Sequence, residues 1–114
     1  MITCVLEYRI DRNREAEFER WCRMWLRLIP RFGGVHHGYF LPSEGHSDVA
    51  LGLFSFASLA DYERYRIAAA EDEEALAATK FRDETAGVLS WNRSFFRPVL
   101  AFDDELQPAD PVDK

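Results

Sequence analysis

The 114-residue sequence predicts an α+β fold in the ferredoxin-like order β-α-β-β-α-β, with the second helix divided into two. Segments rich in β-branched and aromatic residues alternate with segments whose apolar residues recur every three to four positions. Their order is strand, helix, strand, strand, helix, helix, strand. The helices can cover only one face of such a sheet, yet the strands carry large apolar residues on both faces. We therefore expect a second copy of the chain to cover the other face, in a homodimer.

The first strand is predicted over residues 2–10, which end at a polar turn. Successive side chains of a strand point to opposite faces of the sheet. One face therefore carries apolar and aromatic residues such as Leu6 and Tyr8, while the other carries Thr3 and Glu7.

A long amphipathic helix is predicted next, with Asn13 as its N-cap. Its apolar side includes Trp21 and Trp25, which we interpret as core residues rather than as a platform for a cofactor. Arginines on the opposite side are interpreted as a solvent-exposed stripe. Because proline disfavours helical geometry in the residue before it, the helix is predicted to end at Ile29, before Pro30.

Gly33 and Gly34 are expected to turn the chain into a second strand over residues 35–41. Residues 49–56 are almost continuously apolar, which predicts a central strand that is covered on both faces. Gly52 within that strand indicates a bulge or the close approach of another group.

The remaining elements are two helical segments and a last strand. Ser58 can cap the first of these helices, which is predicted to run to Ala70. The second spans about residues 71–85, and Gly87 is its expected stop. The last strand is predicted over residues 88–100, where a proline places its end at or beyond the sheet edge.

Composition narrows the range of functions. We assign residues 1–102 to one domain, and residues 103–114, with five acids, to a C-terminal tail that we expect to be disordered. A chain of net charge −6 without a dense basic patch is not expected to bind nucleic acid. The sequence has no signal-peptide pattern, no membrane-span pattern and no CxxC pair, so we expect a cytoplasmic protein with reduced thiols and no membrane partner. The absence of a phosphate loop, HExxH or GxSxG argues against nucleotide and hydrolase chemistry.

Three stretches resemble one protein family. They are Leu53-Phe-Ser-Phe-Ala-Ser-Leu-Ala-Asp-Tyr-Glu-Arg-Tyr-Arg66, Arg93-Ser-Phe-Phe-Arg-Pro-Val99 and His36-His-Gly-Tyr-Phe-Leu-Pro-Ser-Glu-Gly45. The first two are similar to the NIPSNAP family of dimeric α/β-barrel proteins, and the third is similar to a bacterial branch of it. The resemblance covers about residues 2–100. It implies two sheets that face each other across a dimer, with a cavity in each half.

The sequence departs from the family pattern in the first strand. Many members have an arginine two residues before the strand tyrosine, and here Leu6 takes that place ahead of Tyr8. Residues 11–13 replace a frequent Lys-Pro-Gly, and no role of the missing arginine carries over. The family has no settled common activity. Which sheet face lines the barrel stays open, because the strand pattern favours the face of Thr3 and Glu7 while the resemblance favours the face of Leu6 and Tyr8.

The three histidines lie close together in the sequence. Neighbours on a strand point to opposite faces, so His36 and His37 cannot ligate one metal ion without a bulge, and a site would need Glu44 or His46. We predict no metal site. His37 shares its predicted face with Tyr39, and we expect this pair to line the cavity as candidate catalytic residues, with His37 as proton acceptor. His36 is interpreted as structural.

The predicted ligand-binding set also includes Tyr8, Trp91 and Arg93, and the expected ligand is a small apolar or aromatic molecule. Two classes of function remain. One is a cofactor-independent enzyme, such as an oxygenase or isomerase, and the other is a non-enzymatic binding or interaction protein. No cofactor is predicted, although a haem-degrading variant would use His36 or His37 as its axial ligand.

Overall fold

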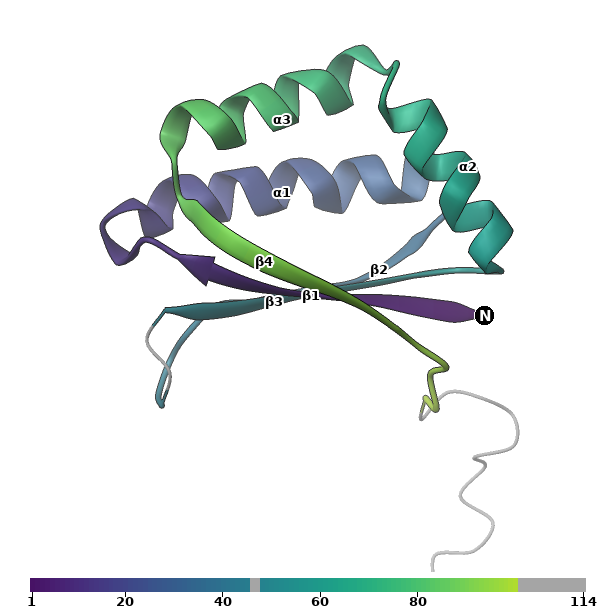
Figure 1. Cartoon of the computed structure of the whole chain (residues 1–114), viewed down its shortest axis with the longest axis horizontal. Coiled ribbons are helices and arrows are strands. Elements are labelled where there is room, and N and C mark those ends of the chain that lie inside the picture. Colours follow the sequence, from purple (N-terminus) through teal and green to yellow (C-terminus); the bar gives the residue numbers. More distant parts are fainter. Residues whose placement is uncertain (46–47, 101–114) are drawn as a thin grey trace, which may run out of the picture.

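The structure is a computed structural model that describes residues 1–45 and 48–100, and it confirms the α+β, ferredoxin-like fold. An antiparallel sheet carries three helices on one face (Figure 1). The strands are β1 (Ile2–Ile10), β2 (Val35–Phe40), β3 (Val49–Phe56) and β4 (Val88–Phe96), in the order β2-β3-β1-β4. The helices are α1 (Glu15–Arg31), α2 (Leu59–Ala69) and α3 (Glu73–Thr85). The predicted central position of residues 49–56 is confirmed; the tail predicted over residues 103–114 lies outside the described residues.

Both ends of α1 differ from the prediction. The N-cap position of α1 is Arg14 rather than Asn13, and Arg14 makes no side-chain cap. Asp11 caps the short 3₁₀ turn η1 (Arg12–Arg14) before the helix, where its carboxylate accepts the Asn13 N–H at 2.9 Å. Pro30 lies inside α1, which continues to Arg31. The proline removes only its own N–H, and the N–H groups of the three residues after the helix bond to carbonyls of its last turn.

The N-caps of the other two helices are short polar side chains. The Ser58 hydroxyl accepts the N–H of Asp61 at 3.1 Å, which confirms the predicted start of α2. The Asp72 carboxylate accepts the N–H of Ala75 at 2.9 Å at the start of α3. Each cap satisfies one of the backbone donors that a helix leaves unpaired in its first turn.

The end of α3 contradicts the predicted role of Gly87. The helix ends at Thr85, and the left-handed residue that follows is Ala86, with φ of 54°. Glycine at position 87 relieves a steric contact, because a Cβ atom there would lie 3.3 Å from the backbone oxygen of Arg14. That contact lets the chain pass close to the start of α1 before it enters β4.

The core lies between the sheet and the helices. We call the covered side of the sheet the helix face and the opposite side the outer face. On β1 the helix face carries Leu6 and Tyr8, both buried, and they pack with Phe18 and Trp21 of α1. The face that a second sheet could meet is therefore the outer face, which carries Glu7 and the residues paired with it.

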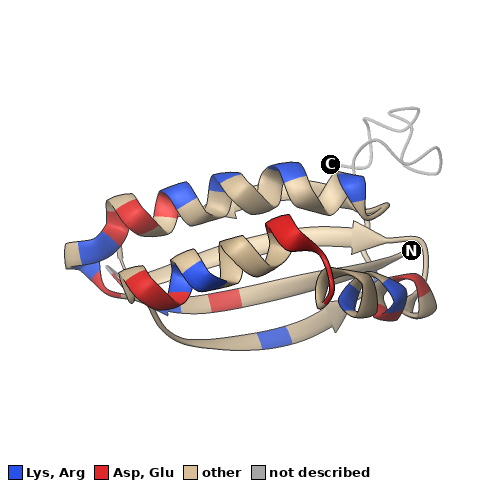
Figure 2. Cartoon of the chain, turned by 90° about the horizontal axis from the view of Figure 1, so that it is seen from above, with Lys and Arg blue, Asp and Glu red and all other residues tan. Residues whose placement is uncertain are grey.

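Most of the charged residues in the described part of the chain lie on the helices rather than on the strands (Figure 2). Acidic residues occupy the first turn of α1 and arginines occur along the rest of it, where Arg23 and Arg27 are exposed as predicted. Arg31 binds Asp72 at 2.6 Å and Glu74 at 2.5 Å, so its guanidinium joins the end of α1 to the start of α3. None of the helices in the described part of the chain combines the length and the apolar composition that a membrane span requires.

Candidate functional site

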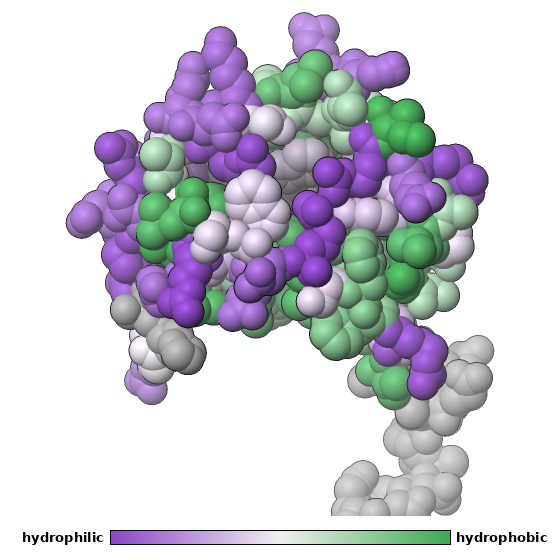
Figure 3. Space-filling model, viewed as in Figure 1, coloured by the Kyte–Doolittle hydropathy of each residue, from purple (hydrophilic) through white to green (hydrophobic). Residues whose placement is uncertain are grey.

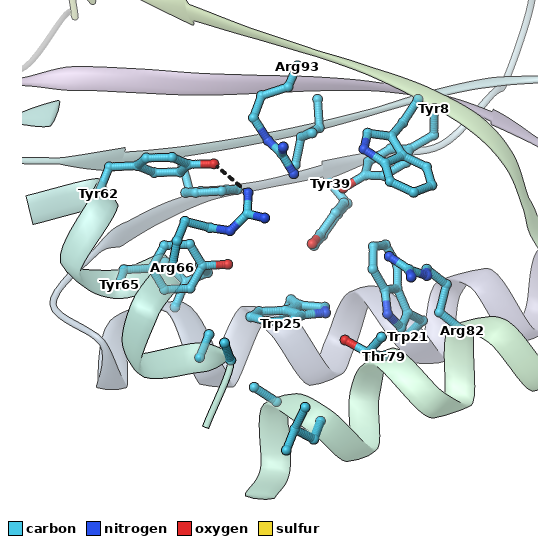
Figure 4. Close-up of a pocket in the computed structure, with 18 residues that line it drawn as sticks. Tyr8, Trp21, Trp25, Tyr39, Tyr62, Tyr65, Arg66, Thr79, Arg82 and Arg93 are labelled. Atoms are coloured by element: carbon cyan, nitrogen blue, oxygen red, sulfur yellow. Dashed lines mark hydrogen bonds between the residues drawn. The ribbon is translucent and has the colours of Figure 1, made fainter. Parts of the chain in front are cut away.

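A cavity of about 210 Å³ lies between the helix face of the sheet and the three helices. Figure 4 shows side chains from the strands and from the helices that project into this common space. Aromatic rings form much of the wall, namely Tyr8, Trp21, Trp25, Tyr39, Phe54, Tyr62, Tyr65 and Trp91. An apolar cavity of about 150 Å³ can hold benzene, so this cavity has room for a substituted aromatic ring.

The cavity reaches the surface beside the edge strand β4, where its lining residues Arg66, Trp91 and Arg93 are exposed. Trp91 of β4 is 44% exposed, whereas Tyr8 on the neighbouring strand is 3% exposed. Two contacts join β4 to the helices on either side of the opening. The rings of Phe95 and Tyr62 lie 4.9 Å apart, and the Arg82 guanidinium lies 5.1 Å from the centre of the Trp91 ring. On this side of the molecule, strongly hydrophilic side chains cross the middle of the surface (Figure 3).

Gly52 positions the ring of Tyr39 against the sheet. A Cβ atom at Gly52 would lie 2.7 Å from the Tyr39 ring, so only glycine leaves room for that ring. The predicted close approach at Gly52 is confirmed. Tyr39 in turn lies beside Tyr8 and Trp21, with ring centres 6.3 Å and 6.2 Å away. A backbone position on β3 therefore determines where a cavity hydroxyl from β2 lies.

Three cavity tyrosines, of which Tyr8 and Tyr65 are buried and Tyr39 is half-buried, stay protonated. Burial raises the pKa of Tyr8, Tyr39 and Tyr65 above the ordinary value for tyrosine, and the hydroxyl of Tyr8 further raises the pKa of Tyr39. In Figure 4 the hydroxyls of Tyr39 and Tyr65 point into the cavity. Each is a neutral group that can donate a hydrogen bond to a ligand.

Two indole N–H groups on α1 lack an acceptor. The Nε1 atoms of Trp21 and Trp25 are buried, and neither has a hydrogen-bond partner among the described residues. An indole N–H can only donate, and buried tryptophans usually find a partner. The interpretation of this pair as core is incomplete, because both side chains also line the cavity.

Three arginines line the cavity, and none of its lining residues within the described chain is acidic. Arg66 donates to the Tyr62 hydroxyl at 3.0 Å, and this hydrogen bond raises the pKa of Arg66. Arg82 binds the carboxylate of Asp83 at 3.1 Å and packs on the ring of Trp91. Arg93 projects from β4 toward the cavity (Figure 4). The cavity therefore combines apolar walls with positive charge at its opening.

The structure brings together four of the predicted ligand-binding residues. Tyr8, Tyr39, Trp91 and Arg93 all line the cavity, whereas His37 does not. The expectation that His37 and Tyr39 share a face is wrong. The register of β2 against β3 shifts between His36 and Gly38, so a β-bulge interrupts the alternation of side chains.

The bulge reverses the predicted positions of the two histidines. The ring of His36 lies on the helix face, 4.7 Å from Tyr39 and 5.6 Å from Phe54, and its Nδ1 accepts the N–H of Gly38 at 2.9 Å. Burial, followed by the charge of His37, lowers the pKa of His36 to about 4. His36 is therefore a neutral ring of the core at physiological pH.

His37 lies on the outer face of the sheet. Its Nε2 is 2.7 Å from the hydroxyl of Ser55, which is 2.6 Å from the hydroxyl of Thr3. Ser55 and Thr3 are buried, and the three side chains link β2, β3 and β1. This chain of hydrogen bonds is separated from the cavity by the sheet itself.

Metal ligands do not converge in the described part of the chain. No group of three or more His, Cys, Asp or Glu side chains there could hold a metal ion. His46, one of the ligands that a site would have needed, lies outside the described residues. Neither His36 nor His37 lines the cavity, so the haem-degrading variant has no described histidine there as an axial ligand. Cys4 and Cys22 are free, buried thiols whose pKa is raised by burial.

Sequence reasoning missed two arginines of the cavity, Arg66 and Arg82. Arg66 follows Tyr62 by four residues, a spacing that places both on one side of a helix. That spacing was a usable signal, because the large ring of a tyrosine on a helix usually packs in the core while its hydroxyl finds a partner. Arg82 gave no comparable signal, because its position depends on how α3 packs beside β4.

Comparison with known proteins identifies relatives of this fold. Residues 5–101 match the family model described as NIPSNAP. No curated protein matches the chain in sequence. A NIPSNAP family protein from Agrobacterium tumefaciens has a similar solved structure, with a TM-score of 0.73 and 22% identity over 86% of this chain and 92% of that one.

Two further solved structures share the architecture. An uncharacterized NIPSNAP domain protein from Burkholderia xenovorans matches with a TM-score of 0.74 and 17% identity, over 91% of this chain and 100% of the other. A protein from Nitrosomonas europaea, named a candidate antibiotic biosynthesis monooxygenase, matches with a TM-score of 0.68 and 10% identity, over 88% and 100% of the two chains. At such identities these likenesses establish the fold alone.

Proposed function

The chain belongs to the NIPSNAP family, and on that premise we propose that it binds a small aromatic molecule in the cavity between its sheet and helices. The observation that carries this proposal is the aromatic wall. Trp21, Trp25, Tyr39 and Tyr65 surround a space large enough for one substituted ring. Such pockets bind ligands mainly by apolar burial, with a few polar groups that set orientation.

A cavity-filling substitution tests the proposal. Ala69 lines the cavity at the end of α2 and is half-buried, while its neighbour Ala68 is exposed and lies outside the cavity wall. Ala69→Leu should fill part of the space and weaken binding of single-ring fluorinated aromatics by about tenfold or more, read by fluorine NMR. Ala68→Leu is the matched control and should leave binding unchanged. If no aromatic probe binds, or if both variants weaken binding equally, the cavity is not the binding site.

We further propose that the binding form is a homodimer joined through the outer face. That face carries the apolar side chains Val5, Val35, Phe40, Val49, Leu51, Leu53 and Phe96, which share one side by the strand registers. Val35, Phe40 and Phe96 are 52%, 53% and 55% exposed in the isolated chain. Exposed apolar clusters of this kind are favourable in water only when a partner covers them. A second copy offers the same surface, as a two-fold interface requires.

A second candidate function is catalysis by the same cavity, as a cofactor-independent oxygenase or isomerase. It is favoured by the donor groups around the cavity, because Arg93, Tyr39 and Trp25 could stabilise an oxyanion that forms on a bound ring. None of the described lining residues is a carboxylate or histidine, so the substrate would enter already ionised. Oxygen consumption and product mass spectra with hydroxylated aromatics test this reading. The absence of both uptake and isomerisation would leave the binding function alone.

A further inference from the structure

We propose that the ligand of the cavity is an anion, specifically a small aromatic carboxylate whose charged group lies between Arg66 and Arg93. This inference rests on the proposed binding function and adds the chemical class of the ligand. The ring would occupy the space among the aromatic side chains, and the carboxylate would lie at the opening beside β4. Three observations about the lining carry the inference.

The first observation is the charge of the lining. The chain as a whole has a net charge of −6, yet its cavity is lined by three arginines and, within the described residues, by no acidic side chain. The cavity wall is therefore positively charged although the chain as a whole is negatively charged. A cleft lined by one sign of charge attracts ligands of the opposite sign.

The second observation is that two of the three cavity arginines, Arg66 and Arg93, form no ion pair with a carboxylate of the described residues, whereas the third, Arg82, binds Asp83. Arg31 binds two carboxylates, and Arg64, two residues from Arg66 on α2, binds Asp61. Arg66 instead donates to a neutral tyrosine hydroxyl, and Arg93 forms no ion pair with any described residue. A guanidinium presents a planar set of donors that matches a carboxylate, so a ligand carboxylate would complete both sites.

The third observation is the donor character of the buried polar atoms. The indole N–H groups of Trp21 and Trp25 are buried without an acceptor among the described residues. The hydroxyls of Tyr39 and Tyr65 stay protonated, because burial raises the pKa of both. A ligand that brings acceptors can satisfy the two indole N–H groups, whereas a ligand that brings only donors leaves them unpaired.

A matched pair of probes separates this inference from the proposed function. Para-fluorobenzoate and para-fluorobenzamide share one ring and nearly one shape, but only the first carries a charge. Fluorine NMR titration of the full-length protein should give an affinity for the benzoate at least about tenfold higher than for the amide. Equal affinities would overturn the inference and leave the proposed function standing. Failure of both probes to bind would overturn the two together.

Variants of the arginines assign the carboxylate site. Arg66→Gln and Arg93→Gln should each lower the affinity for para-fluorobenzoate by about tenfold and leave the amide unaffected. Arg64→Gln is the matched control on the same helix and should change neither probe. Arg66→Lys keeps the charge and should restore part of the preference. A preference for benzoate that survives in the Arg66→Gln, Arg93→Gln double variant, with its melting temperature unchanged, would contradict the assignment.

Discussion

Single residues decide where the polar atoms of this protein lie. Gly52 has no side chain where the ring of Tyr39 packs, and that one absence sets the position of a cavity hydroxyl. His36 and His37, although adjacent, lie on opposite sides of the sheet with different surroundings. The sequence identified both histidines as notable residues. It could not assign their faces, because the bulge at His37, between His36 and Gly38, depends on the register of a partner strand.

The half-buried ring of His36 makes folding sensitive to acid. Its pKa is about 4 in the folded chain and 6.5 without the surrounding protein, so between these values the unfolded chain binds a proton that the folded chain excludes. The stability from the neutral ring is therefore present above pH 6.5 and lost as the pH falls through about 4. The slope is at most about 1.4 kcal/mol per pH unit, and partial solvent access of the ring reduces it.

Urea unfolding at pH 7 and pH 5 measures this effect, with His36→Gln as the test variant. The wild-type protein should lose more of its free energy of unfolding between the two pH values than the variant does. Asn92→Gln, an exposed substitution on β4 that changes no titratable group, serves as the control, and its pH dependence should follow the wild type. Equal pH dependence of wild type and His36→Gln would refute the prediction.

At the scale of elements, periodicity in the sequence predicted the strands and helices, while their ends followed local hydrogen bonds. The alternation in residues 2–10 and the apolar run in residues 49–56 placed β1 and β3 correctly, because each pattern spans many residues. The end of α1 was wrong because Pro30 removes one donor in a turn that other N–H groups complete. Four cavity residues were in the predicted set, but the strand pattern alone did not assign their face, and Tyr8 was favoured by the family resemblance. Arg66 and Arg82 were not in that set, since an arginine on a helix usually faces solvent.

On the outer face, hydrogen bonds among Thr3, Ser55 and His37 connect the strands β1, β3 and β2. Ser55 is fully buried and lies between the hydroxyl of Thr3 and the imidazole of His37. Ser55→Ala should lower the free energy of unfolding by about 1–3 kcal/mol, because it leaves two polar groups without their partner. Ser94→Ala, on the exposed strand β4, should change it by less than about 0.5 kcal/mol. Chemical denaturation of both variants makes the comparison, and equal small effects would show that these hydrogen bonds add no stability.

At the scale of the whole molecule, the sheet separates two functions. The helix face forms the cavity, and the outer face carries the surface that we propose as the dimer interface. Stable protein interfaces bury about 1,200–2,000 Å² in total, which a four-stranded sheet face can supply. The sequence predicted that helices cover one face of the sheet and that a second copy of the chain covers the other, because the strands are apolar on both faces. The dimer itself stays a prediction.

A charge in the middle of the outer face should disrupt the dimer. Leu53 lies on the central strand β3, and Leu53→Glu would place an unpaired carboxylate inside the interface. Light scattering at micromolar concentration should give twice the chain mass of 13.2 kDa for the wild type and a lower mass or aggregation for the variant. Ile67→Glu, on the exposed surface of α2, is the control and should remain dimeric. A stable, folded wild-type monomer at that concentration would contradict the proposal.

The left-handed alanine after α3 means that this fold has not used all the stability open to it. A Cβ atom makes φ of 54° costly at Ala86, while glycine adopts that geometry freely. Ala86→Gly should therefore raise the free energy of unfolding by up to about 1 kcal/mol, after the greater freedom of glycine in the unfolded chain is subtracted. Calorimetry would register this as a higher melting temperature, and a lower one would show that the alanine side chain stabilises the joint. Because Ala86 lies outside the cavity wall, a protein engineer could raise the stability of the fold at this position without altering the binding site.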